Sequence, residues 1–390
     1  MSDILNGLNP QQKEAVMHTE GPLLILAGAG SGKTRVLTHR IAYLIENGFA
    51  EPEDILALTF TNKAAKEMKE RAASLTGKAA DKMLITTFHS ACVRFLKNRM
   101  MLLGYKRGNF VIYDTDEQKK IIRTIFEETG FQGRYPDIRV YDVISFISKQ
   151  KEKMLGPDEL ESIYPDYPLI TVYKEYERIL KKNNALDFDD LLWKTVQLFE
   201  NYPHILHSYQ EQFKYIMVDE YQDTNLVQFK IISMLADKYQ NLCVVGDDDQ
   251  SIYSFRGADI RNILEFEKEF QNTKVIKLEE NYRSTKNILS AANAVISHNQ
   301  ERKEKKLWTQ GEEGNKLRTI TLPDATTEAK FIVSEIERMH NREKADYKDF
   351  AILYRTNAQS RLFEQCLTMK DIPYRLVGAL SFFERKEVKD

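Results

Sequence analysis

The sequence has little cysteine, almost no excess charge and no long apolar run. Its three cysteines lie far apart, which excludes a disulfide framework and a cysteine-rich metal site and fits buried thiols in a reducing cytoplasm. No apolar run approaches membrane-spanning length. The net charge of −2 excludes a global basic field, so any nucleic-acid site must be a local patch. With no internal repeat and no low-complexity segment, the 390 residues predict two or three globular domains.

A glycine-rich turn between an apolar strand and a helix is the most informative feature present. Residues 23–27 are apolar, the turn ends in Gly32-Lys33-Thr34, and the next residues continue at helical spacing. The N–H groups of such a turn converge on phosphate oxygens, the lysine adds a cation, and the threonine hydroxyl can ligate Mg²⁺. Ala27 replaces the first glycine of the general pattern. The alternative is an ordinary turn, but this context predicts a nucleoside triphosphate site.

Four further apolar runs predict strands that end in polar residues. They are residues 55–60, 83–87, 215–218 and 242–245. Short apolar runs alternating with amphipathic helices are typical of a buried parallel sheet in an α/β protein. Ligands bind such sheets beyond the carboxyl ends of the strands, so we expect the site there.

The pattern of predicted strands and helices changes twice along the chain. Charged, helix-periodic sequence predicts a helical insertion at residues 110–184, which divides the first sheet domain into residues 1–109 and 185–277. A second α/β domain is expected over residues 278–390, in which residues 298–314 look like a surface connection. Its expected strands are residues 317–322, 350–354 and 373–377, and its expected helices are residues 326–340 and 358–369. Residues 381–390 look like the start of a helix, so we expect the chain to be the N-terminal part of a longer protein.

Two adjacent carboxylates follow the strand at residues 215–218. Asp219 suits a Mg²⁺ ion held through its water shell, and Glu220 suits the positioning and polarisation of an attacking water. Acidic residues are ordinary at strand ends, so the pair alone is a weak signal. Together with the phosphate loop it predicts hydrolysis of the triphosphate.

The loop after the strand at residues 242–245 combines an amide, two aromatic rings and a cation. Gln250 is a neutral donor that can contact a γ-phosphate. Tyr253, Phe255 and Arg256 place aromatic faces beside a positive charge, which suits unstacked bases. The alternative is that the rings pack into the core.

Three other positions carry weaker signals. Arg283 lies at the start of the second domain, where it could reach across to phosphates as an arginine finger. Phe60 and Asn62 lie where a strand runs into a helix, an arrangement that suits stacking and contacts with backbone phosphates. His89 follows the next strand and has no partner ligands at metal spacing.

The order of these motifs resembles superfamily 1 DNA helicases, most closely the PcrA/UvrD/Rep group. The resemblance runs from Leu8 to Arg361 and rests on six motifs: Ala-Gly-Ala-Gly-Ser-Gly-Lys-Thr, Thr-Phe-Thr-Asn-Lys-Ala-Ala, Thr-Phe-His-Ser, Val-Asp-Glu-Tyr-Gln-Asp, Gly-Asp-Asp-Asp-Gln-Ser-Ile-Tyr and Glu-Asn-Tyr-Arg-Ser. It implies a RecA-like P-loop NTPase sheet with an inserted helical domain and part of a second RecA-like domain. It also implies ATP and Mg²⁺ as cofactors, single-stranded DNA and duplex/single-strand junctions as partners, and 3′-to-5′ translocation in DNA repair or replication. Position 255, commonly Trp in the group, is Phe here.

The resemblance also assigns roles to residues. The implied catalytic residues are Lys33, Glu220, Gln250 and Arg283. The implied nucleotide-binding residues are Gln12, which reads adenine, Tyr282, which stacks on it, and Ala27, Gly28, Ala29, Gly30, Ser31, Gly32, Lys33, Thr34, Arg35 and Arg283. The implied metal residues are Thr34 and Asp219. The implied DNA-binding residues are Phe60, Asn62, His89, Tyr253, Phe255, Arg256 and Asn357.

Three functions remain open at this stage. The first is an ATP-dependent DNA helicase, the second the motor part of a helicase–nuclease, and the third an ATP-gated module that loads partners onto single-stranded DNA. The family's last motifs, including a second arginine finger, would lie beyond Asp390. We therefore expect the 390-residue chain by itself to bind ATP, hydrolyse it weakly and not unwind duplex DNA.

Overall fold

The chain divides into two units between Asn315 and Lys316. The structure, a computed structural model, describes residues 3–377 apart from the side chains of Asp3 and Arg256, so the helix expected to start at residues 381–390 lies outside the described residues. Within residues 3–377, no helix is both long and apolar enough to cross a membrane.

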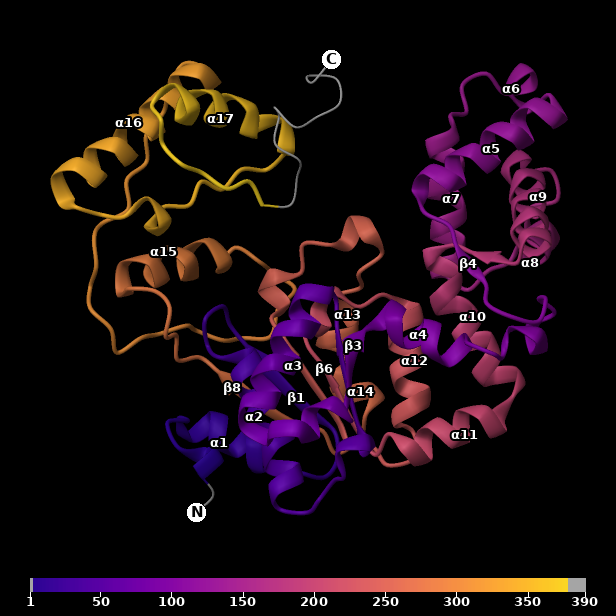
Figure 1. Cartoon of the computed structure of the whole chain (residues 1–390), viewed down its shortest axis with the longest axis horizontal. Helices are drawn as coiled ribbons and strands as arrows, with labels where there is room; N and C mark the ends of the chain where they lie inside the picture. Colours follow the sequence, from indigo (N-terminus) through magenta and orange to yellow (C-terminus); the bar gives the residue numbers. More distant parts are fainter. Residues whose placement is uncertain (1–2, 378–390) are drawn as a thin grey trace. The chain divides into compact units, whose positions relative to one another are not determined.

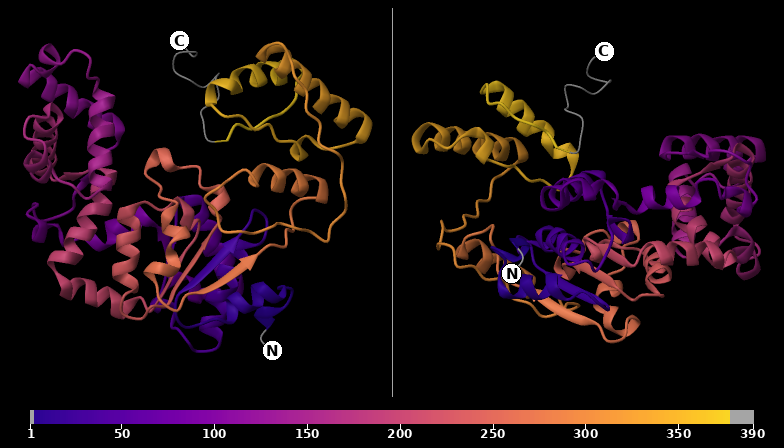
Figure 2. Two further views of the ribbon diagram at one scale, coloured as in Figure 1. Left: turned by 180° about the vertical axis from the view of Figure 1, so that it is seen from behind. Right: turned by 60° about the horizontal axis from the view of Figure 1, so that its bottom comes forward.

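A parallel sheet of six strands lies at the centre of the part of the first unit that the structure describes (Figure 1). Its spatial order is β3-β2-β6-β7-β1-β8. The strands are β1 (Leu23–Ala27), β2 (Ile55–Thr59), β3 (Leu84–Thr87), β6 (Tyr215–Val218), β7 (Leu242–Gly246) and β8 (Lys274–Leu278). The first five confirm the predicted strands. The sequence did not predict β8, which pairs with β1 at the edge of the sheet and is the orange strand of Figure 2.

Successive side chains of a strand point to opposite faces, and this alternation builds two cores. Leu23 and Ile25 of β1 pack in one core with helices α1, α2 and α3, whereas Leu24 and Leu26 pack in the other with α4, α10, α11 and α12. Both faces of the sheet are therefore covered, as continuous apolar strands predict. These helices are α1 (Pro10–Met17), α2 (Lys33–Glu46), α3 (Asn62–Thr76), α4 (Phe88–Leu96), α10 (Phe188–Asn201), α11 (Pro203–Gln212) and α12 (Leu226–Ala236).

A helical segment interrupts this domain, and a small parallel sheet joins its two ends. The short strands β4 (Val111–Ile112) and β5 (Ala185–Leu186) pair at the start and the end of the segment. Between them lie α5 (Thr115–Thr129), α6 (Phe131–Arg134), α7 (Val140–Glu152), α8 (Pro157–Ile163) and α9 (Pro168–Asn183), drawn in purple and magenta in Figure 1. These helices bury an apolar core of their own, in the stretch where the sequence predicts a helical insertion.

One lysine is buried where this segment meets α10. Lys151 of α7 lies 2.7 Å from Glu177 and 2.8 Å from both Asp187 and Asp190. Asp187 also caps α10, because its side chain accepts a hydrogen bond from the N–H of Asp190. Buried charges are tolerated only when they are paired, and here one ammonium group serves three carboxylates.

Residues 298–314 were expected to form a surface connection, and that expectation is wrong in part. Lys305 is buried, and Trp308 forms a bridge with Glu280 beside the end of β8. The segment follows helix α15 (Lys286–Ile296), and Asn293 of that helix donates a hydrogen bond to the carbonyl of Leu307 at 2.8 Å. Its charges pair with carboxylates of the first domain, which a pattern of consecutive charges does not reveal.

The second unit contains two predicted helices but none of its predicted strands. Helices α16 (Ala325–Glu343) and α17 (Ser360–Met369) pack together over Val333, Leu367 and Ile372. Residues 317–322, 350–354 and 373–377 adopt no strand conformation, which corrects the prediction. A strand needs a hydrogen-bonded neighbour, and within residues 316–377 no two segments pair, so Leu317, Leu353 and Val377 stay exposed.

The remaining helices of the described residues are short. They are the α-helices α13 (Arg261–Leu264) and α14 (Phe266–Glu269) and the 3₁₀ helices η1 (Asp3–Leu5), η2 (Pro52–Asp54), η3 (Gly77–Asp81), η4 (Met100–Leu103), η5 (Tyr221–Asp223), η6 (Asp248–Gln250), η7 (Ser254–Arg256), η8 (Tyr347–Asp349) and η9 (Asn357–Gln359). Three of them, η5, η6 and η7, follow β6 and β7 and carry residues of the candidate site.

Candidate nucleotide and single-strand site

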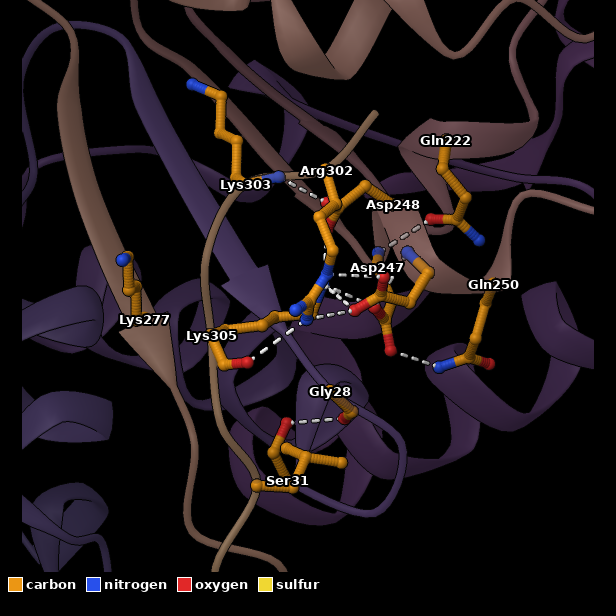
Figure 3. Close-up of polar contacts among 12 residues, drawn as sticks. Gly28, Ser31, Gln222, Asp247, Asp248, Gln250, Lys277, Arg302, Lys303 and Lys305 are labelled. Carbon is orange, nitrogen blue, oxygen red and sulfur yellow. Dashed lines mark hydrogen bonds and ion pairs between the residues drawn. The ribbon is translucent and has the colours of Figure 1, made fainter. Parts of the chain in front are cut away.

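The loop after β1 has the backbone of a phosphate cradle. Gly30 and Gly32 have φ angles of 71° and 91°, a conformation that side chains other than glycine rarely adopt. Helix α2 begins directly afterwards at Lys33, and its first turn presents N–H groups that have no acceptor within the helix. The Ser31 hydroxyl donates to the Gly28 carbonyl at 2.8 Å and closes the turn (Figure 3). The arrangement suits phosphate oxygens.

Neighbouring residues cover this loop closely. A Cβ atom at Gly28 would lie 2.2 Å from Leu307, and one at Gly32 would lie 2.9 Å from the Gln12 amide. Ala27 is buried at the end of β1, the Ala29 carbonyl accepts a hydrogen bond from Asn281, and Arg35 lies in the first turn of α2. The glycines are therefore needed for close approach as well as for their φ angles.

The lysine of the loop pairs with the second of the two carboxylates. Lys33 donates to Glu220 Oε2 at 2.6 Å, and Gln222 donates to the same oxygen at 2.9 Å. Glu220 has a φ angle of 50°, in the left-handed region that is rare for residues other than glycine. A backbone held in this region costs about 1–3 kcal/mol and commonly occurs at functional sites. The side chain is thus fixed beside the phosphate cradle.

Asp219 is a buried carboxylate beside another negative charge. Its side chain is 5 % exposed, and burial followed by the repulsion of Glu220 raises its pKa from 3.8 to about 6. One of its oxygens accepts the N–H of Glu220 at 3.0 Å. A carboxylate in such surroundings gains from a nearby cation, so Asp219 and the hydroxyl of Thr34 suit a Mg²⁺ ion.

A second group of residues joins the N-terminal helix to the segment after β8. Gln12 is buried and donates to the Ser31 carbonyl at 2.9 Å, and it forms a capping box with Asn9. Asn9 donates to the hydroxyl of Tyr282 at 2.9 Å, and the ring of Tyr282 is exposed. The two residues expected to bind adenine are thus connected through Asn9.

Arg283 lies beside the phosphate loop. Its Cβ atom would be 2.8 Å from a Cβ atom at Gly30, and the N–H of Tyr282 donates to the Gly30 carbonyl at 3.0 Å. Asn281 ties the two segments together, since it donates to Ala29 at 2.6 Å and accepts from the N–H of Arg283. A cavity of about 420 Å³ lies between residues 280–285 and 309–312. Its size is in the range of small-molecule sites.

Gln250 is oriented by an aspartate that the sequence did not single out. Its amide donates to Asp247 Oδ2 at 2.6 Å, and the N–H of Asp247 donates to Gln222 at 2.9 Å. An amide NH₂ group carries two protons, so the second can be donated to a phosphate oxygen. Gln222 therefore joins Glu220 and Gln250 in one hydrogen-bond network.

The residues expected to bind DNA lie at several strand ends. Tyr253 and Phe255 have ring centroids 5.9 Å apart, and Phe255 is 67 % exposed. Phe60 contacts Phe88 at the ends of β2 and β3, and His89 contacts Phe188 of α10. Burial lowers the pKa of His89, which favours the neutral ring.

The remaining DNA candidates are not part of this group of rings. Asn62 is exposed at the first position of α3. Asn357 is exposed at the start of η9 in the second unit, and the side chain of Arg256 is not described. The candidates of the first unit therefore follow strands of the same sheet, whereas Asn357 belongs to the second unit.

Sequence reasoning missed the residues that connect the site. Gln222 is buried and lies between Glu220 and Asp223, in a motif that the sequence analysis had recognised. Its place in that motif could have marked it as a candidate site residue. Asn281 lies next to Tyr282 in the same way. Lys305 had no such signal, because its carboxylate partners lie more than 50 residues earlier in the chain.

Comparisons with known proteins identify the family of the chain. Residues 8–271 match the family model of the UvrD/REP helicase N-terminal domain, and residues 276–390 match that of the UvrD-like helicase C-terminal domain. The chain is 50 % identical to the ATP-dependent DNA helicase PcrA of Bacillus subtilis over 392 residues, which cover 100 % of this chain and 53 % of that protein. It is 49 % identical, with the same coverage, to the proteins of that name from Staphylococcus epidermidis and Staphylococcus aureus. It spans about half the length of these relatives. The chain belongs to the UvrD/REP helicase family.

Proposed function

We propose that this chain carries the ATP-hydrolysing and single-strand-binding part of a DNA helicase. The observation that supports this most directly is the gathering of Lys33, Asp219, Glu220 and Gln250 at one edge of the sheet. The aromatic pair Tyr253 and Phe255 follows Gln250 within five residues. The relatives named as ATP-dependent DNA helicases support the same assignment.

The proposed roles at the nucleotide follow from charge and position. Lys33 leaves Glu220 and binds the β- and γ-phosphates, while the N–H groups of residues 28–34 donate to their oxygens. Glu220, released from Lys33 and still held by Gln222, accepts a proton from the attacking water. Arg283 stabilises charge on the γ-phosphate from the other side of the loop.

Thr34 and Asp219 hold Mg²⁺ in this proposal. Bound there, the ion neutralises charge that develops on the phosphate oxygens. Gln12 and Tyr282 bind the adenine, Gln12 through its amide and Tyr282 through its exposed ring. Asn9 contacts both residues and fixes their spacing.

Single-stranded DNA binds through stacking and phosphate contacts. Tyr253 and Phe255 supply faces for unstacked bases, and Phe60, Asn62 and His89 extend the track along neighbouring strand ends. The loop after β7 carries both Gln250 and these aromatic rings. A movement of Gln250 toward the γ-phosphate therefore also moves the stacking surface, which couples hydrolysis to the DNA.

Finer features of the proposal rest on the resemblance. We propose 3′-to-5′ translocation, action at duplex/single-strand junctions in DNA repair or replication, and a cytoplasmic location in keeping with the widely spaced cysteines. We also propose that residues 278–390 contribute to a second RecA-like domain, and that Arg256 of the first domain and Asn357 of the second bind DNA. The match of residues 276–390 to the family's C-terminal model supports this.

The proposal is tested by strand separation with the full-length protein. Duplexes with a 3′ or a 5′ single-stranded tail are mixed with protein, Mg²⁺ and ATP, and Lys33→Ala serves as the inactive control. The proposal expects separation of the 3′-tailed duplex only. Separation of the 5′-tailed duplex alone contradicts the direction. DNA-stimulated hydrolysis without any separation supports the loading module instead.

A further inference from the structure

A short segment after α15 closes over the loop that carries Gln250. Lys305 reaches the three consecutive aspartates after β7: its Nζ atom lies 2.9 Å from Asp247 and 2.7 Å from Asp249, and it also contacts Asp248 (Figure 3). Arg302 donates two hydrogen bonds, of 2.9 and 2.8 Å, to the two carboxylate oxygens of Asp249. The contacts join parts of the first unit that are more than 50 residues apart in sequence.

Lys305 compensates part of the negative charge of the three aspartates, and Arg302 compensates another part. The three aspartates each have an oxygen within 4.8 Å of the others, and such crowding favours a bound cation. Lys305, 6 % exposed, provides that cation. Burial alone would lower the pKa of Lys305, but the aspartates outweigh it and raise this pKa above 10.5. The ammonium group is therefore charged at any physiological pH.

The cluster is connected to Gln250 and Glu220, two side chains that act on the nucleotide and on water in the proposed function. Asp247 pairs with Lys305 through Oδ1 and accepts the Gln250 amide through Oδ2 at 2.6 Å. Its N–H donates to Gln222, which in turn donates to Glu220. The position of Asp247 thus sets where Gln250 points and helps to set Glu220.

The same segment touches the phosphate loop itself. The side chain of Leu307 lies so close to Gly28 that a Cβ atom there would be 2.2 Å away. The N–H of Trp308 donates to Glu279 at 3.0 Å, and the N–H of Asn281 donates to Trp308 at 2.8 Å, which anchors the segment along the end of β8. Lys305 contacts the loop after β7, and Leu307, two residues later, contacts the phosphate loop after β1. In the proposed function the phosphates lie between these two loops.

We propose that Lys305 is a positioning residue for hydrolysis, which holds Asp247 so that the Gln250 amide meets the γ-phosphate. The inference rests on the proposed function, because it assumes that Gln250 acts on ATP. Without the ammonium group, Asp247, Asp248 and Asp249 repel one another and only Arg302 compensates them. The loop after β7 then shifts, and the Gln250 amide no longer points at the γ-phosphate. Lys33 and residues 28–34 still bind the nucleotide.

The test compares ATP affinity with ATP turnover in the full-length protein carrying Lys305→Met. We expect the dissociation constant of a fluorescent ATP analogue to stay near that of the wild type. We expect kcat to fall by about 10²-fold, the typical cost of a misplacement of about 1 Å. Lys306→Met is the matched control, because Lys306 is adjacent and exposed. Its turnover should equal that of the wild type.

A second variant separates charge balance from structural damage. In Lys305→Met/Asp248→Asn, one carboxylate is removed along with the ammonium group, so the net charge of the cluster returns to its original value. We expect this pair to recover most of the lost turnover. Equal loss in the single and double variants, or a parallel loss of ATP binding, shows a merely structural role and overturns the proposal.

A Lys33→Ala variant, measured in parallel, distinguishes failure of the positioning role of Lys305 from failure of the proposed function. If Lys33→Ala abolishes hydrolysis and Lys305→Met hydrolyses at the wild-type rate, the positioning role falls and the proposed function stands. If Lys33→Ala also hydrolyses normally, the proposed function itself falls.

Discussion

Lys33 and Glu220 form an ion pair of 2.6 Å although 187 residues separate them in the sequence. Gln222 donates to the same carboxylate oxygen, so Glu220 is held from two sides. The residue that would bind phosphate and the residue that would activate water therefore begin in contact. In the proposed function, nucleotide binding separates them, and this separation frees the carboxylate for the water.

Glu220→Gln should separate binding from turnover. An amide cannot accept the proton of the attacking water, so we expect kcat to fall by about 10²–10⁴-fold, the usual contribution of a general base. The affinity for ATP should persist, because in this variant Lys33 can bind the phosphates without first breaking an ion pair with the Glu220 carboxylate. Steady-state hydrolysis and binding of a fluorescent nucleotide measure the two effects. Glu70→Gln, at an exposed position of α3, is the control, and wild-type turnover by Glu220→Gln would show that another group is the base.

Asp219→Asn should stabilise the folded chain at neutral pH while removing a proposed metal ligand. The pKa of Asp219 is about 6 in the folded protein against 3.8 without the fold, so the folded state binds this proton more tightly. Ionisation therefore opposes folding, and the stability contributed by this group falls as the pH rises from about 4 to about 6. We expect Asp219→Asn to raise the free energy of unfolding at pH 7.5 by about 1–3 kcal/mol.

Urea unfolding at pH 4 and pH 7.5 measures this effect. The gain from Asp219→Asn should be much smaller at pH 4, where the wild-type carboxyl group is protonated in the folded state and about half protonated in the unfolded state. The Asn side chain can still accept the N–H of Glu220, so that hydrogen bond does not confound the comparison. A variant less stable than the wild type at pH 7.5 would be incompatible with the raised pKa.

Phe255→Ala should weaken the binding of single-stranded DNA. Its ring is exposed beside Tyr253, and a base stacked on an aromatic side chain gains about 1–3 kcal/mol, which is about tenfold or more in affinity. Phe255→Trp keeps a stacking face and should be tolerated. Fluorescence anisotropy at fixed salt measures the affinities.

The matched control for this prediction is Phe49→Ala. Phe49 is also a partly exposed ring, but it follows the end of α2 away from the strand ends that carry the site. Its removal should leave DNA affinity unchanged. Equal affinity for Phe255→Ala and the wild type would exclude Phe255 from the DNA site.

Lys151→Ala should destabilise the helical insertion strongly. The change leaves Glu177, Asp187 and Asp190 without the ammonium group that they share. Breaking a buried ion pair from one side typically costs about 3–5 kcal/mol. Urea unfolding of the variant and of Lys149→Ala, an exposed lysine on the same helix, measures the difference. Equal stability of the two variants would mean that the buried cluster contributes nothing.

The parts of the fold that the sequence predicted depend on local chemistry. The phosphate loop and the carboxylates Asp219 and Glu220 follow apolar strands, and parallel strands bring their carboxyl ends to one edge. The edge strand β8 was missed because Lys274 and Lys277 interrupt its apolar pattern, and its exposed side tolerates them. These charges are typical of strands at sheet edges.

Other features depend on partners that a local pattern does not contain. Residues 317–322 and 350–354 are rich in apolar and β-branched residues, which suits strands, but within the described part of the second unit they find no neighbour to pair with. The charged run around Lys305 resembles a solvated surface, and only the fold brings it to Asp247. Gln222 and Asn281 matter because they are buried between motifs, and burial is a property of the assembled sheet.

The central claim is that ATP hydrolysis at Lys33 and Glu220 is coupled to single-stranded DNA at the edge of the same sheet. The most direct measurement is the steady-state rate of ATP hydrolysis by the full-length protein as a single-stranded oligonucleotide is added at fixed salt. We predict that the rate rises to a plateau, that Phe255→Ala needs more DNA to reach it, and that Lys33→Ala shows no hydrolysis at any DNA concentration. A wild-type rate that is the same with and without DNA would contradict the account.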